Sequence, residues 1–312
     1  MNAGTHVSLV LRSMMFVPGD SEKKLAKCAT LPADALILDL EDSVSPARKA
    51  HARGLAAEFV AHRPASPRSI WVRINPLGTA ECSADLASVM AARPDGLVLP
   101  KVWSAGDVIE LGHWLDELER RFDIALGATR VMPIATETAA AVLTLESYLG
   151  CGRRLAALAW GAEDLCVALG ATTNVDERGE WLPPYELARS LCLLAAAGAG
   201  VPAIDTVYTK LGDANGLERQ ARAARRDGFV GKLAIHPEQI EILNRAFQPT
   251  AEELEHARRV VAAFDAEGVG VVTLDGRMLD RPHLQRARRT LRLASPEPGA
   301  TFEIEEGSSC RS

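Results

Sequence analysis

Short apolar runs alternate with amphipathic stretches along most of the chain. Strands that are apolar along their whole length are buried on both faces, which is typical of parallel sheets covered by helices. Each run is followed by residues with the spacing of an amphipathic helix. Eight such units in series predict an α/β protein, a (β/α)8 TIM barrel, more strongly than an open doubly wound sheet. The predicted strands lie within Met14–Gly19, Ala35–Val44, Ser69–Asn75, Gly96–Val102, Val131–Ala135, Leu155–Trp160, Pro202–Leu211 and Gly231–Pro237.

The barrel is predicted to cover residues 1–248, and the chain beyond it has a different pattern. Residues 249–294 are predicted to form an appended lid segment, with an amphipathic helix over Pro249–Ala266, a β-hairpin that turns at Asp275–Gly276, and a basic helix. Residues 295–312 carry Pro, Gly, Ser and Glu and are expected to form a disordered tail.

Polar side chains follow the predicted strands. In a closed parallel barrel the carboxyl ends of the strands meet on one face, and that face carries the active site in this fold. The sequence therefore indicates an active site there. No GxGxxG or GxxxxGK[ST] motif opens a predicted helix, which argues against a Rossmann or P-loop nucleotide site. The polar residues at the strand ends are Asp20, Glu41, Arg73, Lys101, Glu137, Asp164, Lys210 and His236.

Two carboxylates follow neighbouring predicted strands. Glu137 comes after Val131–Ala135, and Asp164, next to Glu163, comes after Leu155–Trp160. Hard cations such as Mg²⁺ bind carboxylate oxygens, and no Cys/His cluster lies nearby. The pair therefore indicates a magnesium site. The alternative is that both are surface acids at the N-termini of the following helices, where Asp and Glu are common.

Composition narrows the class of protein. The chain has 312 residues, of which 47% are apolar, enough to fill a substantial core. The net charge of −6 and the isoelectric point near 5.7 argue against a general nucleic-acid surface. The six cysteines lack CxxC spacing, so we expect reduced thiols in a cytoplasmic protein, with neither a zinc site nor disulfides. We expect no signal peptide and no membrane span, because the apolar runs are too short.

Eight motifs occur in one order along the chain: RSMMFVPGDSEKKLAK, LILDLEDSVSPARKAHAR, VRIN, LPKV, ATETA, WGAEDL, IHPEQI and DGRMLDRP. In this order the chain resembles the citrate lyase β-subunit-like family of the HpcH/HpaI aldolase superfamily, which includes malyl-CoA and citramalyl-CoA lyases. The resemblance extends from about Arg12 to Arg292. It implies a TIM barrel, Mg²⁺ as cofactor, and cleavage of a carbon–carbon bond in a 3-hydroxyacyl thioester.

The resemblance also implies roles for residues at the strand ends. Glu137 and Asp164 match the two protein ligands of Mg²⁺, and Glu137 lies where the substrate binds. Arg73 matches the arginine that contacts the substrate carbonyl and acidic end, where its forked donors suit a developing enolate oxygen. From the sequence alone, a salt bridge from Arg73 to an acid such as Glu41 is the alternative. Glu41 and Asp42 match acids that hold metal-bound waters.

Further contacts are implied away from the metal. Lys23 and Lys27, one helical turn apart, match basic residues that lie against CoA phosphates, although such spacing is also common on a solvated helix face. His236 and Pro237 belong to IHP, whose backbone helps bind the thioester ligand in the family. Asp280 matches the acid/base aspartate that acts on a neighbouring subunit's barrel, although an Asp before Arg-Pro is also an ordinary turn residue.

One position departs from the family pattern. The family usually has a glutamate two residues after LPK, whereas Lys101 is followed here by Val102 and Trp103. The departure leaves open how the groups around the metal are bonded and which substrate is preferred.

The resemblance therefore implies a Mg²⁺-dependent carbon–carbon lyase that acts on an acyl-CoA of the malyl-CoA or citramalyl-CoA type and yields acetyl-CoA and a 2-oxo acid. It also implies a homotrimer or hexamer. Three alternatives remain: a citrate lyase β subunit acting on citryl-acyl carrier protein, a class II aldolase for small keto acids, and a catalytically silent binding barrel. The complete DGRMLDRP segment and the two lysines favour free CoA. Retention of Glu137, Asp164, Arg73 and Asp280 argues against a silent barrel.

Overall fold

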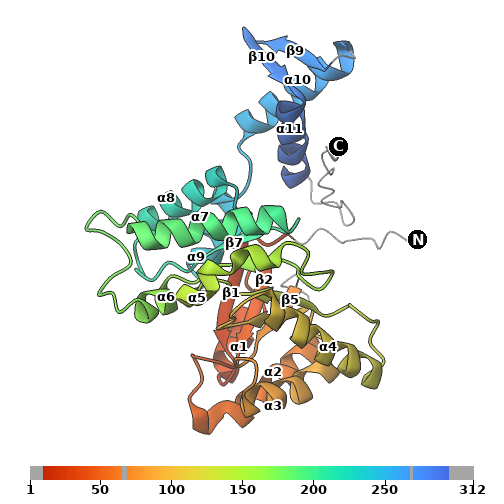
Figure 1. Cartoon of the computed structure of the whole chain (residues 1–312), viewed down its shortest axis with the longest axis vertical. Helices are drawn as coiled ribbons and strands as arrows, with labels where there is room; N and C mark the ends of the chain where they lie inside the picture. The colour runs from red at the N-terminus through yellow and green to blue at the C-terminus, as the bar shows by residue number, and fades with distance from the viewer. Residues whose placement is uncertain (1–9, 65–68, 268–269, 295–312) are drawn as a thin grey trace. The chain divides into compact units, whose positions relative to one another are not determined.

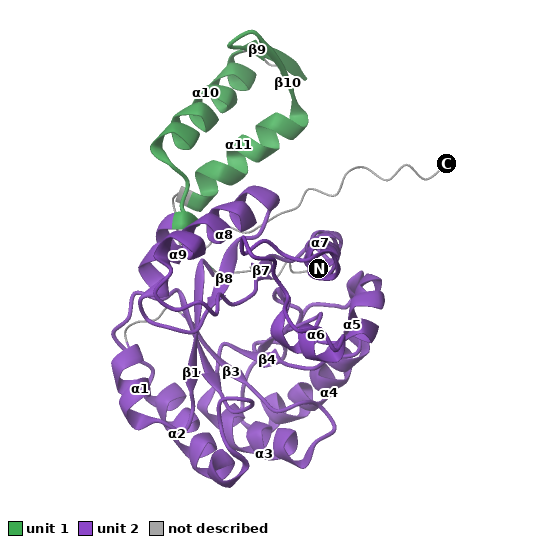
Figure 2. Ribbon diagram, turned by 90° about the vertical axis from the view of Figure 1, so that its left-hand side faces the viewer, with its two compact units in different colours: residues 1–10, 246–312 green, residues 11–245 purple. Residues whose placement is uncertain are grey.

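The computed structural model describes residues 10–64, 69–267 and 270–294. The predicted tail, residues 295–312, lies outside the described residues. Contacts divide the chain into two units, residues 11–245 and a smaller unit that contains residues 246–294 (Figure 2).

The larger unit is built on an eight-stranded parallel sheet with the order β5-β4-β3-β2-β1-β8-β7-β6. Figure 1 labels β1, β2, β5 and β7 of this sheet. Isolated parallel bridges from Val131 to Leu155 and from Ile134 to Ala159 join the two ends of this order. The sheet is therefore closed, and the predicted TIM barrel is confirmed. The strands are β1 (Ser13–Pro18), β2 (Ala35–Asp39), β3 (Ser69–Arg73), β4 (Gly96–Leu99), β5 (Arg130–Pro133), β6 (Leu158–Ala159), β7 (Ala203–Asp205) and β8 (Gly231–Ala234).

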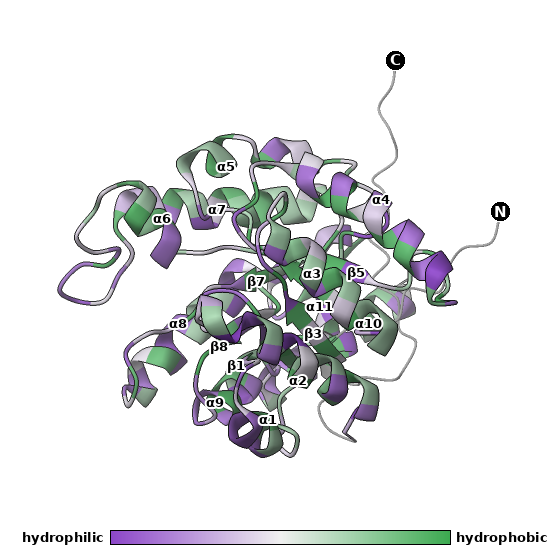
Figure 3. Ribbon diagram, turned by 90° about the horizontal axis from the view of Figure 1, so that it is seen from below, coloured by the Kyte–Doolittle hydropathy of each residue, from purple (hydrophilic) through white to green (hydrophobic). Residues whose placement is uncertain are grey.

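Helices follow the strands and surround the barrel. The apolar strands lie inside this ring, and the helices alternate hydrophobic and hydrophilic residues (Figure 3). All five residues of β2 are buried, as expected for a strand covered on both faces. The helices are α1 (Glu22–Cys28), α2 (Lys49–His62), α3 (Ala80–Val89), α4 (Ala105–Arg121), α5 (Ala139–Leu143), α6 (Glu163–Ala168), α7 (Pro183–Gly198), α8 (Ala214–Asp227) and α9 (Gln239–Ala246), with short 3-10 turns at Pro46–Arg48, Met90–Ala92 and Leu145–Tyr148.

The sixth strand is shorter than its apolar run predicts. The run Leu155–Trp160 contributes only the two residues of β6 to the sheet. Its neighbour β5 ends at Pro133, which has no backbone N–H to donate across the sheet. The ladder between these two segments is therefore reduced to isolated bridges on either side of the proline.

The smaller unit has its own hydrophobic core. It contains α10 (Ala251–Glu267), the antiparallel strands β9 (Val271–Leu274) and β10 (Arg277–Asp280), and α11 (Arg281–Ala294). The strands turn at Asp275 and Gly276, which both have positive φ, as in a two-residue hairpin loop. The buried core residues are Ala257, Val260, Phe264, Val272, Leu279 and Ala287.

Two further expectations concern the whole chain. Among the described residues, no helix is long and apolar enough to cross a membrane. The five cysteines within the described residues are free thiols, and Cys310 lies outside them.

Gly231, in the strand pair that joins β8 to β1, is expected to tolerate no side chain. A Cβ atom at this position would lie 1.7 Å from the backbone oxygen of Leu11. We expect Gly231→Ala to lower the free energy of unfolding by about 3 kcal/mol, because backbone must move to admit the methyl group. Urea unfolding followed by circular dichroism measures the change.

Gly54, exposed in α2, is the matched control. A Cβ there would meet nothing within 4 Å. Gly54→Ala should raise the free energy of unfolding by about 0.5–1 kcal/mol, since alanine is the better helix former. If the two substitutions changed the free energy of unfolding equally, the short distance between Gly231 and the Leu11 backbone would not be what excludes a side chain at position 231.

Candidate active site at the carboxyl ends of the strands

A cavity of about 440 Å³ lies at the carboxyl ends of the barrel strands. Its walls include four of the residues predicted from strand ends and motifs. Such a cavity at this end of the barrel is the expected place for catalysis in the fold. The four residues that it brings together are Asp42, Arg73, Glu137 and Asp164.

Glu137 is buried beyond the end of β5, with 2% of its surface exposed. Its Oε2 accepts a hydrogen bond from the backbone N–H of Lys101. Burial, with the neighbouring charges of Asp164 and Glu41, raises the pKa of Glu137 to about 8. Gly161 leaves room for this side chain, because a Cβ there would lie 2.9 Å from the Glu137 Cγ. A side chain at position 161 would therefore crowd Glu137, which explains the glycine in the WGAED motif.

Asp164 lies in the first turn of the short helix α6, and its side chain is 37% exposed. Its Oδ1 is 3.9 Å from the ammonium group of Lys101. The adjacent Glu163 instead accepts a hydrogen bond of 2.8 Å from the side chain of Asn174. The two neighbouring acids are therefore in different surroundings, although both line the cavity.

Lys101 connects the acids of this site. Its Nζ donates to Glu41 and lies 3.0 Å from Asp42 Oδ1. Burial raises the pKa of Glu41 overall, although the charges of Arg73 and Lys101 act against the shift. The backbone of Lys101 has φ of 53°, in the left-handed region that few residues other than glycine adopt. Lys101 thus orients Glu137 through its backbone and Glu41 and Asp42 through its side chain.

Arg73, at the end of β3, is held by two hydrogen bonds to one carboxylate. Its Nε and a terminal nitrogen donate to the two oxygens of Asp39, at 2.7 and 2.6 Å. A second terminal nitrogen is 3.2 Å from Glu41 Oε2, and the guanidinium carbon lies 4.7 Å from the ring centre of Phe16. Burial alone would lower the pKa of Arg73, but the bonds to Asp39 and the nearby acids raise it. The ion pair with Glu41 that the sequence suggested is present, and Arg73 also lines the cavity.

Glu137 and Asp164 form a donor set that suits Mg²⁺. Both offer carboxylate oxygens to one cavity. Within the described part of the chain, no group of three or more His, Cys, Asp or Glu side chains is arranged to hold a metal ion. If Glu137 and Asp164 hold an ion, water and substrate oxygens would complete its shell, as is common for Mg²⁺. A divalent cation would also offset the negative charge that raises the pKa of Glu137.

Other predicted residues lie outside this cavity. Lys23 and Lys27 are exposed on α1. His236 lies beside a separate cavity of about 80 Å³, with its Nδ1 3.4 Å from the backbone N–H of Glu238, and Pro237 follows it half-buried. Gln239 accepts hydrogen bonds from the backbone N–H groups of Ile235 and His236, and so fixes the IHP segment.

Asp280 belongs to the smaller unit, where it ends β10. Its Oδ1 is 2.5 Å from Nδ1 of His283, one turn further along in α11. This histidine had no role in the sequence prediction, although a spacing of three residues at the start of a helix permits the contact.

For two residues of the main site the sequence predicted no contact: Asp39 was not among the strand-end residues, and Lys101 was predicted only to lie on the active-site face. Asp39 is the first acid of LDLED, and Lys101 stands in LPKV, so their motifs were the available signals. Neither partner could be identified in advance, because Asp39 pairs with a residue 34 positions away and Lys101 with one 60 positions away.

Comparison with known families identifies the family of the chain. Residues 12–237 match the profile of the HpcH/HpaI aldolase/citrate lyase family. The chain belongs to this family. Residues 188–296 also match a profile described as a carbon–carbon bond lyase of the TIM-barrel fold. The predicted family and the predicted class of carbon–carbon lyase are therefore confirmed for this HpcH/HpaI family member.

Individual relatives of this family member cover nearly its whole length. Citrate lyase subunit beta of Haemophilus influenzae is 36% identical over 286 residues, 91% of this chain and 96% of the relative. A (3S)-malyl-CoA thioesterase of Cereibacter sphaeroides is 33% identical over 302 residues, 95% and 98% of the two chains. The structure of CitE from Mycobacterium tuberculosis in complex with magnesium, acetoacetate and coenzyme A has a TM-score of 0.75 and 34% identity, and covers 90% of this chain and 97% of that one.

Proposed function

We propose that this protein cleaves the carbon–carbon bond of a 3-hydroxyacyl-CoA of the malyl-CoA or citramalyl-CoA type and releases acetyl-CoA and a 2-oxo acid. The observation that carries the proposal is the single cavity in which two carboxylates suited to Mg²⁺ lie beside the buried Arg73. Similarity to a malyl-CoA thioesterase and to a CitE structure that contains magnesium and coenzyme A supports this substrate class.

The requirements of the cleavage are assigned to residues of the cavity and to Asp280. Glu137 and Asp164 would hold Mg²⁺, which would supply Lewis acidity and lower the pKa of the substrate hydroxyl. Asp280 accepts the hydroxyl proton, and the electrons of that O–H bond form the new carbonyl of the 2-oxo acid as the C2–C3 bond breaks. The electron pair of the broken bond forms a thioester enolate, whose oxygen accepts hydrogen bonds from Arg73. A proton from solvent adds to the enolate carbon to give acetyl-CoA, and Asp280 returns the proton that it accepted to solvent.

The rest of the substrate is assigned to residues outside the cavity. Lys23 and Lys27 would pair with CoA phosphates, and the backbone at His236 and Pro237 would contact the thioester end. Glu41 and Asp42, both held by Lys101, would accept hydrogen bonds from metal-bound waters. Asp280 would come from the C-terminal unit of a neighbouring copy in a homotrimer or hexamer.

A coupled assay of acetyl-CoA release from malyl-CoA, citramalyl-CoA and citryl-CoA tests the proposal. We expect turnover of a malyl-CoA or citramalyl-CoA type substrate with Mg²⁺, and its loss in EDTA, because the charge of the departing enolate and of the alkoxide needs compensation. Re-addition of Mg²⁺ should restore the rate.

The citrate lyase β-subunit function is the second candidate, favoured by the 36% identity to such a subunit. Release of acetyl-CoA from citryl-CoA alone, or turnover only of citryl-acyl carrier protein, would replace the first proposal by this one. Turnover that is unchanged in EDTA would contradict both.

A further inference from the structure

Trp160 connects the linings of two cavities of the barrel unit. It follows β6, is fully buried, and lines the active-site cavity. Its ring packs edge-to-face against Trp181, with ring centres 4.9 Å apart and an angle of 74°. Trp181 lines a second cavity of about 470 Å³. Trp160 is therefore a residue of the active-site cavity whose buried ring packs against a residue of the second cavity.

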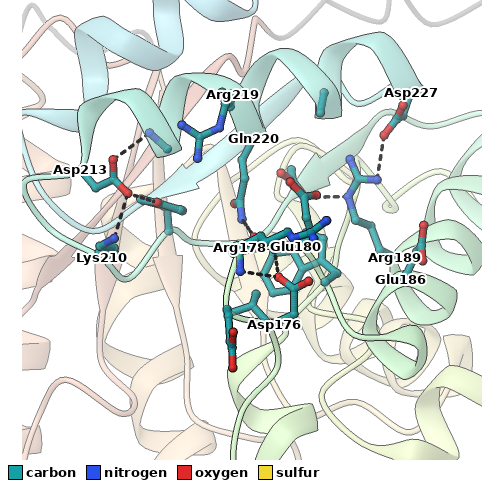
Figure 4. A pocket seen from close by; sticks show the side chains of 18 of the residues that line it. Asp176, Arg178, Glu180, Glu186, Arg189, Lys210, Asp213, Arg219, Gln220 and Asp227 are labelled. Carbon is teal, nitrogen blue, oxygen red and sulfur yellow. Dashed lines mark hydrogen bonds and ion pairs between the residues drawn. The ribbon is translucent and has the colours of Figure 1, made fainter.

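The second cavity differs from the first in its chemistry. It lies among residues 175–181, α7, the segment after β7, and α8, and most of its walls are charged or polar (Figure 4). Several charges of its lining pair with one another, such as Arg189 with Asp227 at 2.9 Å and Lys210 with Asp213 at 3.4 Å. A polar space of this kind next to a lyase site would admit water or longer polar substituents if the packed rings of Trp160 and Trp181 were absent.

A buried ion pair fixes the orientation of Trp160. Trp160 Nε1 donates to Asp205 Oδ1 at 2.7 Å, and Lys232 Nζ donates to Asp205 Oδ2 at 2.7 Å. Asp205 is 1% exposed and Lys232 is fully buried. Burial of an ion pair costs desolvation free energy, and the attraction between the charges offsets this cost only when their geometry is good. We therefore expect the Asp205–Lys232 pair to orient Trp160 more than to stabilise the fold. Rotation of the indole would leave the carboxylate of Asp205 short of one donor.

The segment after Trp160 leads directly to the proposed metal site. Gly161 contacts Glu137, and Asp164 follows in the first turn of α6. The acidic end of a substrate that reaches Glu137 and Asp164 consequently lies next to the indole.

We propose that Trp160, oriented by Asp205, is a specificity-determining residue that limits the size of the substituent on the hydroxyl-bearing carbon, and hence of the 2-oxo acid released. The inference rests on the proposed function for the position of that acid. On this inference small substituents fit the active-site cavity, and larger ones require the fully buried ring of Trp160 to move.

Binding of glyoxylate, pyruvate and 2-oxobutyrate in the presence of Mg²⁺, measured by isothermal titration calorimetry, tests the inference. Wild-type protein should bind these acids more weakly as they grow. Trp160→Phe, which shortens the ring, should shift the preference by about tenfold toward the larger acids, the size of effect that one methylene has in a fitted pocket. Trp114→Phe, on α4 and outside both cavities, is the matched control and should not alter the ranking.

A second variant covers the case in which Trp160→Phe does not fold. Trp181→Leu removes the edge-to-face partner from a half-buried position and should shift the ranking in the same direction by a smaller factor, about threefold. A merely structural role for Trp160 would weaken the binding of all three acids equally, and that result would overturn the inference. So would an unchanged ranking, or a wild-type protein that binds none of the acids.

The same measurements separate this inference from the proposed function. Suppose that wild-type protein releases no acetyl-CoA but binds the oxo acids, and that Trp160→Phe shifts their ranking. This result would refute the proposed substrate and support the specificity role of Trp160. Wild-type protein that releases acetyl-CoA, with a ranking of the oxo acids that Trp160→Phe leaves unchanged, would support the proposed function and refute the role of Trp160.

Discussion

Replacing Glu137 by Gln is expected to remove tight Mg²⁺ binding and to lower the rate of acetyl-CoA release by about 10³-fold, since a metal acting as Lewis acid supplies several kcal/mol of transition-state stabilisation. The amide keeps the size of the side chain but removes its charge, and only one other carboxylate, Asp164, is proposed to hold the ion. Mg²⁺ affinity should fall by more than the roughly 10–100-fold that follows loss of a group supporting a ligand. Calorimetric titration with Mg²⁺ and the coupled assay measure the two effects.

Glu163→Gln is the matched control. Glu163 lines the same cavity and precedes Asp164, but its carboxylate is bonded to Asn174. Loss of this charge should leave Mg²⁺ affinity within a few-fold of wild type, because electrostatic effects at a distance are modest beside loss of a ligand. If Glu137→Gln binds Mg²⁺ as wild type does, or if both substitutions weaken it equally, the assignment of Glu137 as a ligand is wrong.

The barrel could be predicted because its strands are buried on both faces. Continuous apolar runs such as Ala35–Asp39 have no exposed side, and the order of runs and helices left few alternatives to a closed parallel sheet. The short β6 could not be predicted. It depends on the pairing of Leu155–Trp160 with a strand that ends in Pro133, and the partner of a strand is not visible in its own pattern.

The site could be predicted only in part, for a related reason. Strand ends identify which residues face the cavity, and Arg73, Glu137 and Asp164 are found there. Contacts among them depend on register and on backbone conformation. The backbone of Lys101 is in the left-handed region, and its N–H donates to Glu137. This conformation could not be predicted from the sequence, because glycine is the residue that usually adopts it.

Trp103, which stands where the family usually has a glutamate, lies outside the active-site cavity. Its side chain is 67% exposed, it is not part of the wall of the active-site cavity, and its backbone N–H donates to Asp107. The substitution therefore leaves Glu137 and Asp164 in the same cavity, and the polar contacts of Glu41 and Asp42 with Lys101 are made without a carboxylate at position 103.

Asp280→Asn is expected to lower kcat by about 10²–10⁴-fold, the contribution of a general acid–base group, while Mg²⁺ affinity stays unchanged. Asn retains the shape of the side chain at the end of β10 and can still contact His283, but it cannot accept the hydroxyl proton. Steady-state kinetics with the preferred thioester measures the loss.

Asp275→Asn, at the exposed hairpin turn of the same unit, is the control and should keep wild-type kcat, because Asn also tolerates positive φ. Unchanged kcat in Asp280→Asn would remove this residue from the mechanism.

Mixing the two inactive variants decides whether Asp280 acts on a neighbouring copy. Chains with Asp280→Asn keep an intact barrel site, and chains with Glu137→Gln keep an intact Asp280. If equal amounts are unfolded together and reassembled into a cyclic oligomer in which each barrel takes Asp280 from the next copy, about a quarter of the sites combine both intact parts. Activity should then return to about a quarter of that of wild-type protein treated in the same way. If Asp280 serves the barrel of its own chain, no site in the mixture is complete and no activity returns.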